Sequence, residues 1–574
     1  MHFKMNLETL VSRPHSVKAQ MSNHSWNRGI SNFFMEDVPF SWSTGKKFSK
    51  IIVRYIMLLL QNQKTEVITH CYEIGAGIGQ LSKYILEDLS SRNKLNAIKF
   101  HSSDSSEKIV KELKNSSVFS KYKDYIQFKT MTFDALKFPK TTPPHFLILS
   151  YVLDVIPQHH LIWKEGEIKE EKVVSRLNGA PLLDTSSQPF QSIQSSDIPN
   201  WVENAEPTTV LNHLTRITQC IDEEIHSDTQ HPLSKDEQGL LKGFFKEKEI
   251  NNCRFNYSKS IITSFKTLFK HAPKTCLWLI QDVGDMTPEG TDKKLIFSYG
   301  VCQFYRIYFP LIQYIAEQFK FKVKCTSFPD GNTQHMIIYR GLPEDDINDV
   351  FSDTTQTPFT AEETKINQAV HDLAIQSEDK PTENSSVFYK KVTTMLQDMK
   401  DKDDLSYSFN LSIAKECYCK QLYSEALKHT EELIREYGDF AISAKLIQGQ
   451  SYTALGDYKK AKDSLKQAIK VAPFIPELYL QLSIIFAKTK DYDSFLQQVI
   501  HYLRTVETIP IWNHIFTFII VLTHYQKNGK DGNREKAKNY IEAMKTFIKA
   551  GHFNISDSIS EKINTFNVND ICDH

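Results

Sequence analysis

The sequence predicts an α/β domain built on a mostly parallel, doubly wound sheet, followed by an all-α region of helical repeats. Two observations lead to this prediction. Apolar strand patterns alternate with helical patterns in the first half of the chain, as they do where crossover helices join parallel strands. In the second half, alanines recur at a spacing of about 34 residues, which is typical of stacked helix pairs.

The composition favours a globular protein with several domains. Of the 574 residues, 40% are hydrophobic and 11% aromatic, which is enough apolar surface to oppose the entropy of the unfolded chain. A chain of this length usually divides into domains of roughly 150 residues. The 69 basic and 69 acidic residues balance, so no net charge attracts a phosphate backbone or an anionic lipid. We therefore expect no nucleic-acid partner.

Cysteine spacing and hydropathy predict a cytoplasmic protein. The nine cysteines include no CxxC pair, so no metal site is expected and the thiols should be reduced. The N-terminus lacks the apolar core of a secretory signal. The most apolar stretch, residues 511–525, is shorter than the roughly 20 residues that cross a bilayer, so we interpret it as a buried helix.

The elements of the sheet domain follow from hydrophobic periodicity. A helix should precede the first strand, and that strand should end in a glycine turn. The predicted order is helix 48–61, strand 66–77, helix 81–91, strand 96–104, helix 107–114, strand 125–135 and strand 145–154. The last of these is a continuous apolar run, as expected for a strand covered on both faces.

A second set of elements closes the domain. A buried strand at 275–285 and a helix at 309–319 precede two strand patterns that we interpret as a closing hairpin. We therefore assign residues 45–341 to the sheet domain and residues 1–44 to an N-terminal helical segment. Residues 185–260 read as a helical insertion, which would emerge above the carboxyl ends of the strands as a lid or a substrate platform.

An acidic linker and a repeat region complete the predicted organisation. Residues 342–386 are rich in Asp, Glu, Ser and Thr, which is typical of a linker. Residues 387–574 contain residues that fall at the offsets of a tetratricopeptide repeat, namely Ala414, Ala426, Gly449, Tyr452, Ala461, Leu465, Ala468 and Pro473. Such units bury their faces by stacking, so a helical solenoid is predicted.

The glycine turn after the first strand is the strongest functional signal. Gly75, Gly77 and Gly79 follow a buried strand and precede a helix, where glycines allow a ligand to approach the backbone. The spacing is G-x-G-x-G instead of the G-x-G-x-x-G of dinucleotide sites, and Glu73 precedes it. A carboxylate there would repel a pyrophosphate, whereas S-adenosylmethionine carries positive charge and no phosphate. We therefore predict S-adenosylmethionine as the cofactor.

Two further carboxylates lie where that cofactor needs them. Asp104 ends the second strand, where an acid can accept both ribose hydroxyls, and Asp134 ends the third strand, where an acid can meet the adenine amino group. Alternatively, each is a polar residue in a turn. The complete predicted cofactor site comprises Glu73, Gly75, Ala76, Gly77, Gly79, Asp104, Ser105, Asp134, Ala135 and Ser150.

On these motifs, residues 34–341 resemble the class I S-adenosylmethionine-dependent methyltransferases, whose fold is Rossmann-like. The segments MEDVPFSWSTG (35–45) and LSYVLDVIPQHHLIW (149–163) are similar to those of a bacterial group that joins a methyltransferase domain to tetratricopeptide repeats. A more distant similarity is to the complex I assembly arginine methyltransferases. The Asn-Glu pair of their motif is replaced here by Ser150 and Tyr151.

The catalytic candidates follow the fourth strand. Methyl transfer needs a positioned acceptor and, in many cases, the removal of its proton. Asp154, at the end of the strand, and His159 nearby are predicted to do this. Alternatively, Asp154 caps the following turn, and His159 and His160 are exposed loop residues. Asp282 and Asp285 are interpreted as turn residues, with a polar rim of the site as the alternative.

The sequence thus predicts a methyltransferase that acts on a protein recruited by the repeats. The alternative is a catalytically inactive, methyltransferase-like scaffold whose repeats bind other proteins. A homo-oligomer is compatible with either hypothesis.

Overall fold

The computed structural model describes most of the sheet domain and part of the helical region. The described residues are 4–6, 10–26, 44–63, 67–134, 142–178, 221–228, 233–287, 294–299, 302–328, 332–354, 384–397, 407–472 and 475–489, with a few isolated residues besides. Ala135 of the predicted cofactor site and the apolar stretch 511–525 lie outside the described residues.

A mixed sheet forms the centre of the first domain. In spatial order its main strands are β5 (Ile126–Thr130), β4 (Ile98–Asp104), β3 (Thr69–Ile74), β6 (Phe146–Ser150), β11 (Cys276–Asp285), β16 (Thr333–Arg340) and β15 (Lys322–Ser327). The first five are mutually parallel, and β16 runs antiparallel to both β11 and β15. The short strand β14 (Ile307–Tyr308) pairs with the end of β11. The sheet therefore agrees with the predicted parallel core and closing hairpin.

The strand order creates a switch point between β3 and β6. From β3 the chain moves outward through β4 and β5, then returns to the other side of β3 as β6. In open α/β sheets, ligands bind beyond the carboxyl ends of the strands at such a reversal. The glycine turn and Ser150 end the two strands that flank it.

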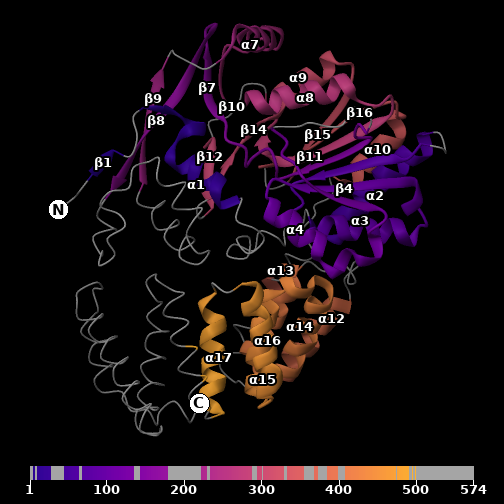
Figure 1. Ribbon diagram of the computed structural model, residues 1–574, viewed down its shortest axis with the longest axis vertical. Helices are drawn as coiled ribbons and strands as arrows, with labels where there is room; N and C mark the ends of the chain where they lie inside the picture. Colours follow the sequence, from indigo (N-terminus) through magenta and orange to yellow (C-terminus); the bar gives the residue numbers. More distant parts are fainter. Residues whose placement is uncertain are drawn as a thin grey trace.

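Helices cover both faces of the main sheet (Figure 1). Side chains along a strand alternate between faces, so Leu277 and Leu279 of β11 join one hydrophobic cluster and Trp278 and Ile280 the other. The first cluster contains side chains of α2 (Lys46–Asn62), α3 (Gln80–Ser91) and α4 (Glu107–Asn115). The second contains side chains of α7 (Lys235–Glu247), α8 (Lys259–His271) and α9 (Phe309–Gln318).

A helix occupies the start of the predicted acidic linker. Helix α10 (Glu344–Thr354) buries Ile347 and Val350 in the same cluster as α2. Three of its acidic residues, Glu344, Asp345 and Asp346, lie in the first turn, where negative charge is favourable to the helix dipole. The acidic residues at the start of the predicted linker therefore belong to a helix. The compact domain continues to at least residue 354.

A second, antiparallel sheet accompanies the main one. It contains β7 (His159–Lys164), β8 (Glu167–Asn178), β9 (Ile221–Asp228), β10 (Asn252–Tyr257) and two short N-terminal strands, β1 (Lys4–Asn6) and β2 (Val11–Ser12). A ribbon of β12 (Ile296–Tyr299) and β13 (Cys302–Tyr305) lies apart from both sheets. In the N-terminal segment, predicted to be helical, these two strands precede helix α1 (Val17–Trp26).

The helical prediction for residues 185–260 is wrong where the structure describes this segment as strands. Both β9 and β10 are strands, and only α7 and the start of α8 are helical among the described residues. Strand β9 is an acidic strand with mostly exposed side chains, so it carries no apolar signal. In β10 the alternation of Cys253, Phe255 and Tyr257, all buried, has the period of a strand.

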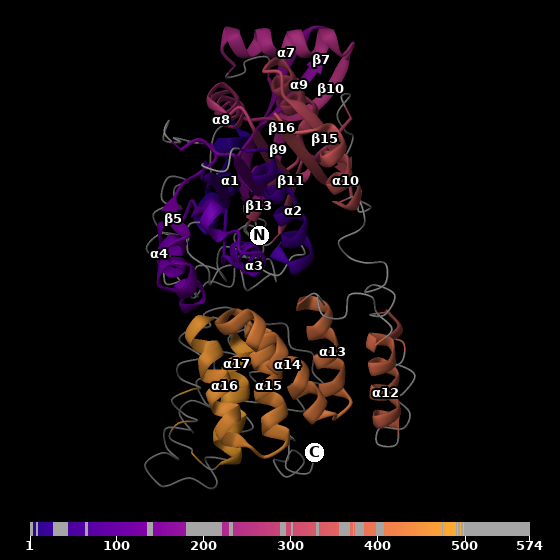
Figure 2. The ribbon, with the colours of Figure 1, turned by 90° about the vertical axis from the view of Figure 1, so that its right-hand side faces the viewer.

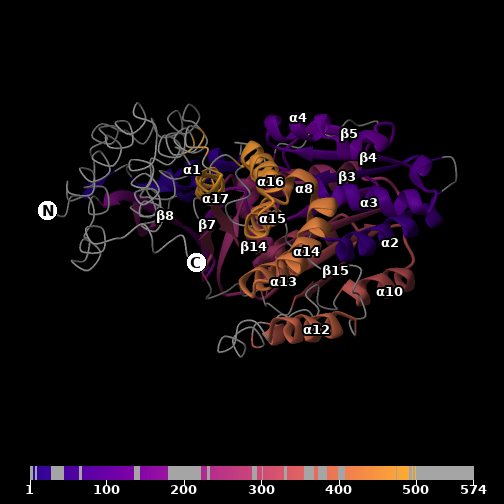
Figure 3. The same cartoon turned by 90° about the horizontal axis from the view of Figure 1, so that it is seen from below.

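The C-terminal region is helical as far as the structure describes it. Helix α12 (Asn384–Gln397) stands to one side of five successively packed helices (Figures 2 and 3). These are α13 (Tyr407–Cys419), α14 (Tyr423–Tyr437), α15 (Ile442–Ala454), α16 (Tyr458–Val471) and α17 (Pro476–Lys488). A Cβ atom on Gly449 would lie 2.7 Å from Leu465 Cγ, so α15 and α16 approach too closely for a larger residue.

In the part of the chain that the structure describes, four short 3-10 helices join these elements. They are η1 (Arg13–His15), η5 (Leu95–Ala97), η6 (Ser117–Tyr122) and η10 (Gly438–Phe440). None of the described helices is both long and apolar enough to cross a membrane. Within the same residues, no group of three or more His, Cys, Asp or Glu side chains is placed to hold a metal ion.

A polar contact joins the helical region to the sheet domain. The end of α14 places Glu436 beside two lysines, with Lys46 Nζ donating to Glu436 Oε2 at 3.1 Å. Lys83 Nζ donates to the carbonyl oxygen of Glu436 at 2.7 Å. Lys83 lies in the first turn of α3, so this contact reaches the helix that follows the glycine turn.

Candidate functional site

The glycine turn has a backbone that requires glycine. Gly75, Gly77 and Gly79 have φ values of 77°, 53° and 74°, a region that residues with side chains rarely adopt. A Cβ atom on Gly75 would lie 2.6 Å from Val152 Cγ2, and one on Gly79 would lie 2.8 Å from Leu113 Cδ2. A Cβ atom on Gly77 would meet nothing within 4 Å. Two glycines therefore permit close packing, whereas Gly77 leaves an open approach to the backbone.

Asp104 holds this turn from the end of β4. Its Oδ2 accepts from the backbone N–H of Gly77 at 3.1 Å, and its Oδ1 accepts from Ser106 N–H at 3.0 Å. Burial raises the pKa of Asp104, and the backbone donors oppose that increase. Each carboxylate oxygen can accept a further hydrogen bond, so the predicted contact with ribose hydroxyls is compatible with these bonds. Its predicted neighbour Ser105 is exposed.

Glu73 lies behind the glycine turn, between β3 and α3. It is 4% exposed, and its carboxylate accepts a short hydrogen bond from Ser82 Oγ of α3. Burial raises its pKa to about 7, against the effect of the Ser82 hydrogen bond. Glu73 thus connects the first strand to the first helix, and Ser82, which the sequence analysis did not single out, is its partner.

The remaining cofactor candidates lie at the other strand ends. Asp134 is exposed and follows β5 by four residues. The backbone N–H of Ala76 donates to Ser103 O at 2.9 Å, which joins the glycine turn to β4. Ser150 ends β6, and its buried hydroxyl oxygen has no hydrogen-bond partner among the described residues. Asp104, the glycine turn and Ser150 therefore end three adjacent strands.

The loop after β6 is held by Asp282 of β11. Asp282 Oδ2 accepts from the backbone N–H groups of Val152, Leu153 and Asp154 at 3.2, 2.8 and 3.4 Å. Tyr151 begins this loop with a left-handed φ of 53°. Asp282 is fully buried, so the interpretation of this residue as part of a surface turn or rim is wrong.

Asp154 is buried beside that carboxylate. Its side chain has no exposed surface, and its carboxyl oxygens have no hydrogen-bond partner among the described residues. Burial and the neighbouring Asp282 raise the pKa of Asp154 well above its usual value, which favours the protonated form. Burial also raises the pKa of Asp282, to about 7. Of the two predicted roles of Asp154, deprotonating an acceptor would require the loss of its proton, whereas orienting an acceptor would not.

His159 and His160 belong to a strand, so their interpretation as exposed loop residues is wrong. They are the first residues of β7, and their side chains point to opposite faces of the antiparallel sheet. His159 Nδ1 lies 2.6 Å from Oε1 of the fully buried Glu170. Burial lowers the pKa of His160 to about 4, which keeps its ring neutral.

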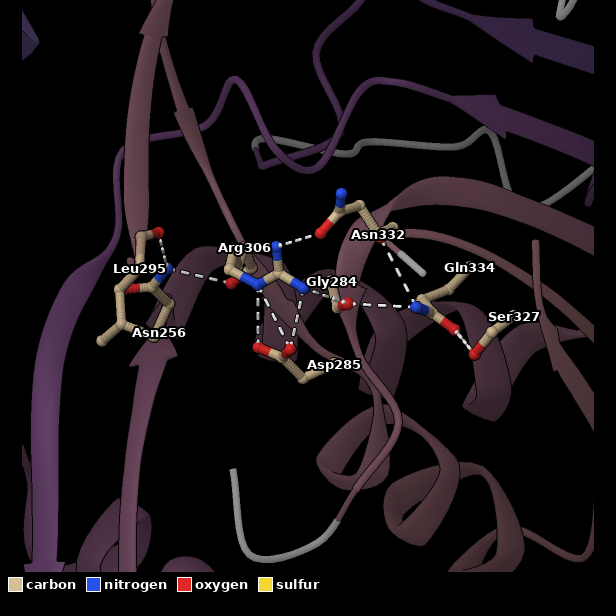
Figure 4. Close-up of polar contacts among 8 residues, drawn as sticks. All are labelled: Asn256, Gly284, Asp285, Leu295, Arg306, Ser327, Asn332 and Gln334. Carbon is tan, nitrogen blue, oxygen red and sulfur yellow. Dashed lines mark hydrogen bonds and ion pairs between the residues drawn. The ribbon is translucent and has the colours of Figure 1, made fainter. Parts of the chain in front are cut away.

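Arg306 joins the ends of several strands near this loop (Figure 4). Its Nη2 lies 2.9 Å from Asp285 Oδ1 and donates to Gly284 O at 3.0 Å, while its Nη1 donates to Asn332 Oδ1 at 3.1 Å. The guanidinium is 5% exposed. Sequence reasoning did not find Arg306, because the partners of its side chain lie at least 21 residues away in the chain.

These features define a class of protein. The mixed sheet with its switch point, the left-handed glycine turn and the acid after the next strand form a methyltransferase-like α/β fold, followed by a helical C-terminal region. Residues 51–235 match a family described as "Putative S-adenosyl-L-methionine-dependent methyltransferase". S-adenosyl-L-methionine is the cofactor of the matched family, which confirms the cofactor predicted from the sequence. The match supports a transferase and does not specify the acceptor.

The solved structures found by comparison have low sequence identity to the chain. A COG1565 superfamily member from Burkholderia thailandensis bound to S-adenosyl-homocysteine is 9% identical, with a TM-score of 0.37, over 58% of this chain and 89% of its own. A native COG1565 superfamily protein from the same organism is 10% identical, with a TM-score of 0.34, over 58% and 96%. The plantazolicin methyltransferase BpumL in complex with SAH is 9% identical, with a TM-score of 0.18, over 56% and 99%. No curated protein matches the chain significantly.

Proposed function

We propose that the chain is a cytoplasmic methyltransferase of the bacterial repeat-containing group, and that it transfers a methyl group from S-adenosylmethionine to a protein recruited by its C-terminal helices. The observation that carries the proposal is the glycine turn, which leaves an open approach at Gly77 directly beside the Asp104 carboxylate. The match of residues 51–235 to a methyltransferase family supports the same conclusion.

The residues at the strand ends fit S-adenosylmethionine chemically. Asp104 would accept the ribose hydroxyls, Asp134 would accept from the adenine amino group, and Gly77 would leave room for the ligand against the backbone. A phosphate ligand fits less well, because Asp104 already presents a carboxylate to the N–H of Gly77. When bound, this cofactor supplies an electrophilic methyl group on its sulfonium.

The catalytic residues of this proposal are His159 and Asp154. The acid partner at Nδ1 of His159 favours the tautomer that carries its proton there, so Nε2 would take a proton from the acceptor. Asp154 would act as a hydrogen-bond donor as long as burial and Asp282 keep it protonated. A neutral acid that orients the acceptor is compatible with methyl transfer, because the sulfonium already activates the methyl group.

The helical region would bind the protein acceptor as a tetratricopeptide-repeat solenoid. Helices α13–α17 pack in succession, and Ala426, Ala461 and Ala468 are completely buried where neighbouring helices meet. Gly449 permits the close approach of α15 to α16. These are the positions at which the repeat pattern requires small residues.

Transfer of a labelled methyl group tests the proposal. The full chain is incubated with tritiated S-adenosylmethionine and a cell lysate, and the labelled proteins are separated by electrophoresis. We expect at least one labelled protein band with the wild-type chain and none with Gly77→Asp. Saturable binding of the cofactor without any transferred label would favour the inactive scaffold, and the absence of binding would contradict the methyltransferase proposal itself.

A further inference from the structure

A single buried carboxylate organises the loop after β6. Asp282 has no exposed surface, and its two oxygens accept from four backbone N–H groups. Three of these belong to residues 152–154, and the fourth, at 2.9 Å, is that of Val283. Buried backbone N–H groups need an acceptor, and an ionised one makes shorter and stronger hydrogen bonds. Asp282 supplies that acceptor from a strand about 130 residues further along the chain.

The two ends of the loop are also fixed. Tyr151 N–H donates to Gln281 O at 2.8 Å, which continues the pairing of β6 with β11 beyond Ser150. At the other end, Tyr305 N–H donates to Asp154 O at 2.7 Å. The left-handed backbone of Tyr151 is unfavourable for a residue with a side chain and persists where its surroundings hold it. The loop conformation therefore depends on contacts from β11 and β13.

The loop in turn contacts the glycine turn. The Val152 side chain lies so close to Gly75 that a Cβ atom there would be 2.6 Å from Val152 Cγ2. Two residues further on, Gly77 donates its N–H to Asp104. A continuous series of contacts thus leads from Asp282 through Val152 to the turn and to Asp104.

We propose that Asp282 is a positioning residue of the cofactor site, which holds the loop 151–154 against Gly75 and thereby sets the shape of the glycine turn. The inference deepens the function proposed above and rests on it for its effect on cofactor binding. Asp282 itself does not touch the cofactor. Its effect passes through Val152, whose backbone it binds and whose side chain packs on the turn.

Three variants of the full chain test this role. Asp282→Asn retains an oxygen that can accept N–H groups but loses the charge. Asp282→Leu keeps the branched shape, with larger methyl groups in place of the oxygens, and has no acceptor. Asp285→Asn is the matched control, because Asp285 is a largely covered carboxylate of the same strand, with its side chain 11% exposed, whose hydrogen bonds go to Arg306. Binding of S-adenosylhomocysteine is measured by calorimetry, and amide hydrogen exchange is followed in peptides covering residues 74–80 and 150–156.

Asp282→Asn should weaken S-adenosylhomocysteine binding by roughly three- to tenfold, and Asp282→Leu by roughly tenfold more, since charged hydrogen bonds are about twice as strong as neutral ones. In the ligand-free protein, both variants should accelerate exchange in both peptides. Asp285→Asn should change neither peptide. A smaller loss of binding in Asp282→Asn than in Asp282→Leu distinguishes a positioning role from a general loss of stability.

Several outcomes would overturn the proposal. One is faster exchange at 150–156 with no change at 74–80, which would show that the loop does not shape the turn. An unchanged affinity in Asp282→Asn would also overturn the proposal. So would an effect of Asp285→Asn equal to that of Asp282→Asn. If Asp282→Leu fails to fold, Asp282→Asn alone decides. If the wild-type chain does not bind the ligand, the proposed function fails, while exchange in the ligand-free protein still decides whether Asp282 controls the turn.

Discussion

The two halves of the carboxyl edge of the sheet are built in different ways. On the β3–β4 side, the glycine turn and Asp104 lie within about 30 residues of one another and are joined by short-range hydrogen bonds. On the β6–β11 side, Asp282 binds a loop about 130 residues earlier in the chain, and the Arg306 side chain donates to both Gly284 of β11 and Asn332. The half that we propose binds the cofactor is therefore encoded locally, and the half that we propose faces the acceptor depends on tertiary contacts.

The largest effect is expected from Gly77→Asp. The new carboxylate would fill the open approach and repel Asp104, so binding of S-adenosylhomocysteine should fall by more than about a hundredfold. Gly166→Asp is the matched control, since Gly166 also has a positive φ, 89°, and nothing within 4 Å of a Cβ atom, but lies in the β7–β8 turn. Calorimetry on both variants, with circular dichroism to verify folding, checks this. Equal affinity in the two variants would refute the assigned site.

Glu73, on the β3–β4 side, makes the stability of the protein depend on pH. Its pKa of about 7 in the folded protein exceeds the ordinary 4.5, so the folded state binds the proton more tightly and stability falls as pH rises between these values. Glu73→Gln should remove this loss. Relative to wild type, its free energy of unfolding should increase by about 2–3 kcal/mol from pH 4 to pH 8. Urea denaturation at the two pH values measures this, and a pH-independent difference would contradict it.

Asp104→Ala should have the next largest effect. Removal of a carboxylate that accepts two ribose hydroxyls should weaken S-adenosylhomocysteine binding by roughly ten- to a hundredfold. Part of that loss would arise because the Gly77 N–H group also donates to Asp104 and would lose its acceptor. Asp104→Asn keeps an acceptor and should bind with intermediate affinity. Wild-type affinity in Asp104→Ala, measured by calorimetry, would move the ribose contact to another residue such as Ser105.

The smallest effect concerns the contact between the two halves. Gly75→Ala should be destabilising, because its Cβ atom would collide with Val152. Val152→Ala should relieve that collision, so the two substitutions should be non-additive by about 1 kcal/mol in a double-mutant cycle of unfolding free energies. Strictly additive effects would indicate that the loop and the turn are energetically independent.

The sequence predicts the local features well. Strands β3, β4, β6 and β11 follow from apolar runs, and the glycine turn follows from the spacing of Gly75, Gly77 and Gly79 after the first strand. Asp104 was found because its position depends only on where β4 ends. The buried alanines of the helical region follow a local pattern for a similar reason, since neighbouring helices there contact one another in chain order.

The remaining features depend on contacts that no local pattern records. The sequence around Asp282 contains no pattern that predicts its hydrogen bonds to the loop after β6. The strand β9 is acidic and largely exposed, so it has no apolar alternation. In α10, the acidic first turn gives the segment the composition of a linker. Its residues Ile347 and Val350 are nevertheless buried by packing near α2. Local composition was a poor guide wherever tertiary packing determined the role of a residue.

A crystal structure of the full chain with S-adenosylhomocysteine tests the central claim most directly. The account predicts the ligand at the carboxyl ends of β3 and β4, with its ribose hydroxyls within hydrogen-bonding distance of Asp104, its backbone-facing side against Gly77, and the loop 151–154 still bound to Asp282. A ligand bound elsewhere, or one at this edge that leaves Asp104 bonded only to Gly77 and Ser106, would contradict it.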